Sequence, residues 1–163
     1  MKSLPSLLLG IWVVIGGAPV WAQDKAEQLP AEALAFEIPE NDEGLPGAGP
    51  LRRYQWFQEL WSRKRSVWAK RIQEDQKAIV FLGDSITQGW GDTMGGSFPG
   101  MKVANRGISG DTTRGMLIRL QDDVLALNPT AVVLLMGTND LDEGAAPEVI
   151  AGNVKLIVAA LKA

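Results

Sequence analysis

Three polar, glycine-containing turns in the second half of the chain hold residue types that could carry out acyl transfer. Each turn directly follows a short apolar run: Gly83-Asp84-Ser85 after 78–82, Asn105-Arg106-Gly107 after 102–104, and Gly137-Thr138-Asn139-Asp140 after 131–136. A serine hydroxyl can act as a nucleophile once a base takes its proton. The backbone N–H groups of Ser85 and Gly107, with the side-chain amide of Asn139, could stabilise the anion that forms. The pattern predicts Ser85 as nucleophile beside a three-donor oxyanion hole.

Each turn taken alone has a plainer interpretation. Glycine turns are common in any fold, and a lone serine at this place often caps a helix. Their joint placement after successive apolar runs favours chemistry. The other turn residues are expected to support the site rather than react: Gly83, Asp84, Asn105, Gly137, Thr138 and Asp140. Two arginines, Arg106 and Arg114, could contact a substrate or brace the loops.

Apolar runs and helical patterns alternate from residue 78 onwards. Strands are expected at 78–82, 102–104 and 131–136, and helices at 112–126 and 147–161. This order is typical of an α/β fold with a doubly wound parallel sheet. The uninterrupted run at 131–136 favours a central strand covered on both faces. In such sheets ligands bind outside the carboxyl ends of the strands, which is where the three turns lie.

The first 76 residues divide into three segments. Residues 1–22 have a positive start, an apolar run and small residues before Gln23, the pattern of a signal peptide cleaved near Ala22. Export to the periplasm or the extracellular space follows from this interpretation; the alternative is a membrane anchor, but the run is too short for a stable span. Residues 23–50, rich in proline and glycine, are expected to form a flexible leader. Residues 51–76 carry an apolar stripe expected to dock a helix on the domain, with membrane or glycan contact as the alternative.

Composition excludes several classes of protein. The 163-residue chain has a net charge of −3, with no cysteine and no histidine. Nothing in this charge suggests a nucleic-acid partner, and the usual zinc sites and thiol nucleophiles are excluded. Other serine and nucleotide motifs are missing too: there is no Gly-x-Ser-x-Gly elbow, no Ser-x-x-Lys pair and no Gly-Lys-Ser/Thr loop. No cofactor or metal is expected.

The three turns resemble the motifs of the SGNH or GDSL-type hydrolases. Gly83-Asp84-Ser85 is similar to the nucleophile motif, Gly107 to the second motif and Gly137-Thr138-Asn139-Asp140 to the third, and the likeness covers 78 to about 161. The run 107–113 looks especially like the branch of platelet-activating-factor acetylhydrolases and related bacterial esterases. The resemblance implies a flavodoxin-like sheet of five strands in the order 2-1-3-4-5. It also implies metal-free hydrolysis of small acyl esters, often acetyl groups on carbohydrates or lipids.

The chain departs from this family pattern in two ways. The family's Asp-x-x-His motif, which supplies the acid and base of the triad, has no counterpart here. Only about three of the five strands are present, which would leave 131–136 as an uncovered edge. We therefore expect the chain to be the N-terminal part of a longer hydrolase and to be inactive alone. A non-catalytic protein that binds glycans or esters is the main alternative, and a base donated by a partner chain is a lesser one.

Overall fold

The fold of residues 36–163 is known from a computed structural model. The expected signal peptide at 1–22 and the first part of the expected leader, 23–35, lie outside the described residues. None of the helices within 36–163 has the length and apolar character needed to cross a bilayer.

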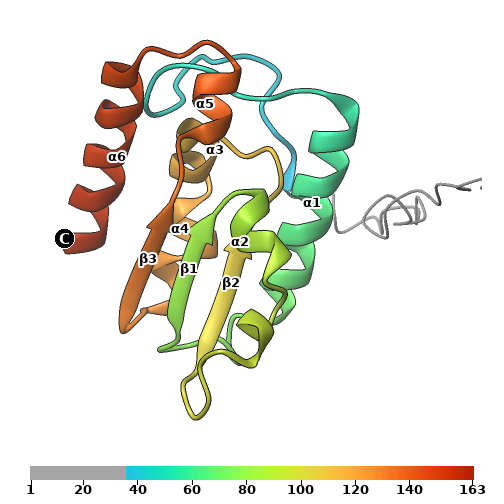
Figure 1. The fold of residues 1–163 in the computed structure, drawn as a ribbon. Coiled ribbons are helices and arrows are strands. Elements are labelled where there is room, and N and C mark those ends of the chain that lie inside the picture. Colours follow the sequence, from blue (N-terminus) through green and yellow to red (C-terminus); the bar gives the residue numbers. More distant parts are fainter. Residues whose placement is uncertain (1–35) are drawn as a thin grey trace, which may run out of the picture.

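Three parallel strands form the sheet: β1 (Ile79–Gly83), β2 (Val103–Gly107) and β3 (Ala131–Leu135). They lie in the order β2-β1-β3, with β1 hydrogen-bonded to both neighbours (Figure 1). This order and direction confirm the predicted α/β fold, because a chain that winds from β1 to one side and then crosses to the other must place its first strand in the middle.

Strand β2 is longer than the sequence suggested. Asn105 and Arg106 were expected in a loop, but both pair in register with β1, opposite Phe81 and Leu82. Their side chains are buried and hydrogen-bonded, Asn105 to backbone carbonyls and Arg106 to Asp75. Burying a polar side chain costs little free energy when it is hydrogen-bonded. Two polar residues can therefore continue a strand beyond the point where the apolar run in the sequence ends.

One face of the sheet packs on helices and forms the main core. Val80 and Leu82 of β1 and Ala104 of β2 meet apolar residues of α3 (Thr113–Ile118), α4 (Leu120–Asp123) and α6 (Pro147–Lys162). From these helices the core contains Met116, Leu120 and Ile157, and the segment just after α4 adds Val124 and Leu127. The predicted helix at 147–161 is confirmed, with Pro147 in its first turn, where the missing N–H of proline has no helical partner to lose.

The predicted helix at 112–126 is divided into three parts. Helix α3 ends at Ile118, α4 runs from Leu120 to Asp123, and a 3₁₀ turn, η4, covers Leu125–Leu127. At the first break, Arg119 has ψ near 1° and its fully buried guanidinium bonds to Asp111 and to the Arg106 carbonyl. The apolar periodicity of 112–126 predicts one continuous helix, because a pattern of apolar residues carries no information about a buried polar contact.

Helix α1 (Gln55–Lys70) docks on the domain through the predicted apolar stripe. Phe57, Trp61 and Trp68 are buried and form a second cluster with Ile38, Leu51 and Ile108. Arg65 of the same helix is also buried, and its guanidinium bonds to Asp123. Trp56, which lies beside the stripe, is half exposed.

Residues 36–50 are held against the domain, so the prediction of a flexible leader is wrong for this part. Asn153 of α6 exchanges two hydrogen bonds with the backbone of Ala48, at 3.0 and 2.9 Å. Arg114 of α3 pairs with Asp42 and donates to the Gly49 carbonyl. The proline and glycine content predicts a segment without regular secondary structure, and residues 36–50 have none of any length. The long-range contacts nevertheless hold the segment in one path over the domain.

The other face of the sheet is partly open. Along β3 the side chains of Val133 and Leu135 are exposed, so the strand is not covered on both faces as its sequence suggested. Here the strands and α2 (Ser85–Gly89) border an apolar groove of about 240 Å³. The groove is lined by Phe81, Ile86, Thr87, Trp90, Met94, Phe98, Val133 and Leu135.

Candidate active site

Ser85 is the first residue of α2, which begins immediately after β1. The helix is capped by Asp84, whose carboxylate accepts a 3.0 Å hydrogen bond from the Ile86 N–H. Ser85 is exposed, and within residues 36–163 no hydrogen bond to its hydroxyl is found. The cap is thus the aspartate, which leaves the serine hydroxyl accessible to a substrate.

The three predicted turns leave the sheet at the same end. Gly83, the last residue of β1, is in register with Gly107 on one side and with Leu135 on the other. The Ile108 N–H donates to the Gly83 carbonyl at 3.1 Å, which continues the pairing one step beyond the strands. Helices α2 and α5 (Thr138–Asp142) begin at this end of the sheet (Figure 1). Ser85, Gly107 and Asn139 therefore belong to neighbouring strand ends.

Gly107 allows α2 to lie directly against the end of β2. A Cβ atom at this position would lie 2.3 Å from the backbone nitrogen of Gln88, closer than any real contact. The N–H of Gly107 donates to Asn105 Oδ1 at 2.8 Å, while Asn105 Nδ2 donates to the carbonyls of Thr87 and Gly91 at 2.6 and 2.9 Å. In this structure the Gly107 N–H is already bonded to Asn105, so it would have to share that bond to reach a substrate oxygen.

The Asn139 side chain is oriented at both ends of its amide group. Its Nδ2 donates to the backbone carbonyl of Asp111 at 2.8 Å, and its Oδ1 accepts from Arg52 Nη1 at 3.3 Å. An amide nitrogen has two hydrogens, and this arrangement uses one of them. The second hydrogen has no acceptor within residues 36–163.

The remaining residues of the third turn shape the loop. Gly137 has φ of 109°, a left-handed conformation that turns the chain from β3 into α5 and that a side chain would strain. Thr138 begins α5 and is exposed. Asp140 is fully buried and accepts hydrogen bonds from the Thr113 N–H at 2.9 Å and its hydroxyl at 2.6 Å. Asp140 thus ties α5 to α3.

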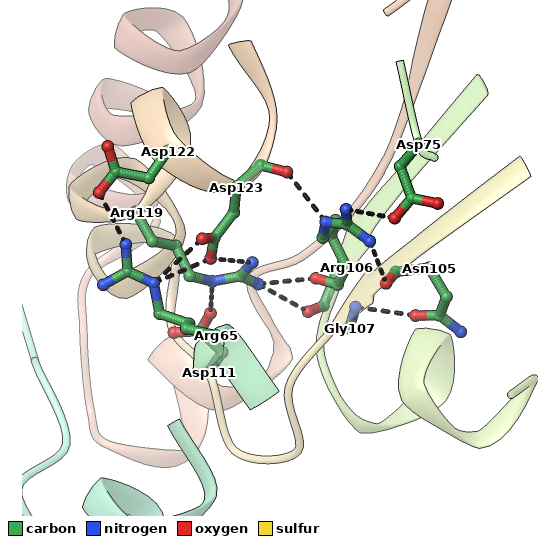
Figure 2. Close-up of polar contacts among 10 residues, drawn as sticks. Arg65, Asp75, Asn105, Arg106, Gly107, Asp111, Arg119, Asp122 and Asp123 are labelled. Carbon is green, nitrogen blue, oxygen red and sulfur yellow. Dashed lines mark hydrogen bonds and ion pairs between the residues drawn. The ribbon is translucent and has the colours of Figure 1, made fainter. Parts of the chain in front are cut away.

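A buried cluster of arginines and aspartates supports the loop after β2 (Figure 2). Arg119 bonds to Asp111 at 2.8 Å and shares Asp123 with Arg65, at 3.4 and 3.0 Å. Arg106 pairs with Asp75 at 2.7 Å. The guanidinium groups also lie over the rings of Trp61 and Trp68, 5.0 to 5.8 Å from the centroids. Helix α1 and the loop are therefore fastened to the same cluster.

Burial shifts the pKa of two members of this cluster. It raises the pKa of Asp111 to about 6, against the opposing effect of the Arg119 cation. Asp111 Oδ1 has no hydrogen-bond partner in the described part of the chain, so the charged form is only half satisfied. Burial lowers the pKa of Arg106, although its pairing with Asp75 acts in the opposite direction.

Sequence reasoning missed several residues that build the site. The predicted loop-bracing role of Arg106 and Arg114 agrees with their contacts. The sequence did not point to Arg52 and Asp111, which contact Asn139, or to Arg119, which contacts the loop after β2. A charged residue inside an otherwise apolar pattern, such as Arg119 between Ile118 and Leu120, was the available signal. Within residues 36–163 no group of three or more acidic side chains is placed to hold a metal ion.

Comparison with known proteins identifies the family to which this chain belongs. The model of the GDSL-like lipase/acylhydrolase family matches residues 81–163, half of the chain, and covers all three turns. The chain belongs to this family.

Individual relatives are similar over part of their length. The chain is 30% identical over 105 residues to platelet-activating factor acetylhydrolase IB subunit alpha2 of Rattus norvegicus, covering 60% of this chain and 43% of the rat protein. It is 43% identical over 42 residues to an acetylxylan esterase of Geobacillus stearothermophilus, covering 26% of this chain and 19% of the esterase. A solved GDSL-like lipase from Bacteroides thetaiotaomicron superposes with a TM-score of 0.51 at 31% identity, covering 63% of this chain and 51% of the lipase. The chain thus spans about half or less of each of these relatives.

Proposed function

We propose that this chain is the N-terminal part of a serine ester hydrolase in which Ser85 attacks the carbonyl carbon of a small acyl ester. The observation that carries the proposal is the alignment of Gly83 with Gly107 and Leu135, which brings the three turns to one end of the sheet. The exposed Ser85 hydroxyl then has donors from two neighbouring strand ends within the same loop cluster. Acetyl esters are the proposed substrates, since an acetylxylan esterase and an acetylhydrolase are among the relatives.

In the proposed mechanism the oxyanion receives hydrogen bonds from three groups. The Ser85 N–H lies at the start of α2, and the second N–H of Asn139 Nδ2 is left over after its bond to Asp111. Gly107 is the third donor and must share its bond with Asn105. Preorganised donors of this kind need no rearrangement when charge develops, which is why they lower the barrier.

The chain has no histidine, so we propose that the acid and base of the triad are supplied by residues outside it. A serine hydrolase without its base retains only about 10³- to 10⁴-fold catalysis over water. The 163-residue chain should therefore hydrolyse p-nitrophenyl acetate barely above background. DNA downstream of the Ala163 codon should encode two further strands and an Asp-x-x-His motif. A stop codon followed by unrelated sequence would count against this part of the proposal.

The nucleophile is tested in the protein extended by that downstream sequence. Ser85→Ala should abolish hydrolysis of p-nitrophenyl acetate, and unchanged activity would mean that another residue attacks. Asn139→Ala should cost about 3 kcal/mol of transition-state stabilisation, the usual effect of removing one oxyanion donor. Leu141→Ala is the matched control, because Leu141 lies on the same helix, is 58% exposed and belongs to none of the three turns.

The missing histidine also favours a second candidate function. The chain would be a binding protein that uses the three turns to hold an ester or glycan but does not hydrolyse it. This function requires the 163-residue chain to fold alone and to bind acetylated sugars or esters. Thermal melting followed by circular dichroism separates the two ideas: a chain with no cooperative transition could not serve as a stable binding protein.

A further inference from the structure

Two aromatic side chains stand exposed beside the candidate active site. Tyr54 precedes helix α1 and Trp56 lies in its first turn, and their side chains are 52% and 50% exposed. The rings are nearly parallel, with an interplanar angle of 13° and centroids 6.4 Å apart. This separation is that of offset rings, so neither ring covers the other.

The pair is attached to the loop that carries the second turn of the site. Trp56 packs so closely on Gly110 that a Cβ atom there would lie 2.6 Å from the indole ring. Gly110 also adjoins Arg52, the residue that orients the Asn139 amide. A ligand resting on the two rings would therefore lie next to the loop 107–111 rather than on a remote surface.

Charged and polar groups surround these rings. Arg52 and Glu143 form an ion pair of 2.6 Å beside them. The Tyr54 hydroxyl is 3.4 and 3.5 Å from the two Glu143 oxygens, which is long for an O–H···O bond and leaves this hydroxyl with bonding capacity. Flat aromatic faces with hydrogen-bonding groups at their border suit a ring that is apolar on its C–H face and polar at its rim.

We propose that Tyr54 and Trp56 form a subsite for a pyranose ring of the substrate, so that the ester cleaved at Ser85 is carried by a carbohydrate. Sugar C–H groups pack on the electron-rich faces of the rings, while sugar hydroxyls bond to Tyr54 and Glu143. A lipid chain would fit the apolar groove along Phe81 and Val133 better, because none of the residues that line that groove is charged. The assignment of substrate class rests on the proposed function, but binding of the sugar itself does not.

The test measures binding of xylohexaose and cellohexaose, with and without acetyl groups, to the 163-residue chain by calorimetry and by the indole N–H resonances. The Trp56 resonance should shift on addition of at least one of these sugars. Trp56→Ala and Tyr54→Ala should each weaken binding at least tenfold, whereas Trp56→Phe, which keeps a ring, should weaken it less than threefold. Circular dichroism verifies that each variant is folded.

Trp90 provides the matched control, since it is 49% exposed but lies on the apolar groove. Trp90→Ala should leave sugar affinity unchanged. The subsite is overturned if none of the four sugars binds or if Trp56→Ala binds sugar as tightly as the parent chain. It is also overturned if Trp90→Ala loses as much sugar affinity as Trp56→Ala. It is also overturned if Trp56 mediates binding to phosphatidylcholine vesicles instead of sugar.

Hydrolysis of p-nitrophenyl acetate by the extended protein separates this proposal from the proposed function. That ester carries no sugar, so its cleavage reports on Ser85 independently of the subsite. Hydrolysis without sugar binding would remove the subsite and leave the esterase. Sugar binding without hydrolysis would leave the subsite and remove the esterase.

Discussion

Arg52 Nη1 donates a 3.3 Å hydrogen bond to Asn139 Oδ1, although 87 residues separate the two in sequence. The same guanidinium pairs with Asp142 at 2.7 Å and Glu143 at 2.6 Å on helix α5. The segment before α1 is thereby fastened to the turn that presents the proposed oxyanion donor. This one side chain links the N-terminal segment to the orientation of the Asn139 amide.

Replacing Arg52 should destabilise the protein. Arg52→Ala leaves the largely buried Glu143 without its cation, so we expect the free energy of unfolding to fall by about 1–2 kcal/mol, between exposed and buried pairs. Urea denaturation measures the change. Arg53→Ala is the control, because Arg53 pairs with the exposed Asp42 and should cost less than about 1 kcal/mol. Equal losses in the two variants would contradict the special position of Arg52.

Gly107→Ala should be one of the more damaging small substitutions. The added methyl would meet the backbone of α2 at 2.3 Å, where no flexible side chain can move aside. Overpacking of this kind should lower the free energy of unfolding by about 3 kcal/mol, measured by thermal or urea denaturation.

Gly89→Ala tests whether that loss depends on the site. Gly89 ends the same helix and has open space around it, so the substitution should be neutral or stabilise by up to about 1 kcal/mol. A similar loss at Gly89 would show that α2 tolerates no side chain at either place and would remove the packing argument.

Asp140→Asn should loosen the contact between α5 and α3. The amide offers one acceptor where the carboxylate uses two oxygens to accept from Thr113, so one buried donor loses its partner. We expect a loss of about 1–3 kcal/mol in urea denaturation. Asp142→Asn, on the exposed side of α5, should cost under about 1 kcal/mol. Should Asp140→Asn prove as mild as Asp142→Asn, the structural role of Asp140 would be refuted.

The raised pKa of Asp111 predicts a pH dependence of stability. Burial raises this pKa from 3.8 to about 6, so between these values the folded state binds more protons at Asp111 than the unfolded state does. The contribution of Asp111 to stability is therefore greatest below pH 4 and declines as pH rises to 6, by on the order of 2–3 kcal/mol.

Comparing the unfolding free energy of the parent chain with that of Asp111→Asn separates the effect of Asp111 from that of the other carboxylates. The difference in unfolding free energy between the parent chain and Asp111→Asn should shift against the parent as pH rises from 4 to 6, and then stay level. Urea denaturation at several pH values measures it. A difference that is constant over this range, or that grows in favour of the parent, would show that Asp111 is ionised in the fold well below pH 6.

Much of the fold could be predicted because its signals are local. The apolar runs at 78–82 and 131–136 and the stripe in α6 each identify an element from neighbouring residues alone. The strand order β2-β1-β3 followed from the resemblance to a known fold. The break at Arg119 and the added strand residues Asn105 and Arg106 did not follow, because each depends on a buried polar partner distant in sequence.

The sequence by itself determined the three strands in outline, the helix that became α6, the three turns after the strands and, through the absence of histidine, the lack of the usual general base. These depend on residue type and on spacing within a few positions. Only the tertiary structure decided that the Gly107 N–H is already bonded to Asn105, that Arg52 and Asp111 fix the Asn139 amide, and that Tyr54 and Trp56 stand exposed beside the loop. The physical reason is that hydrogen bonds and burial depend on which groups meet in space, and those partners lie tens of residues apart along the chain.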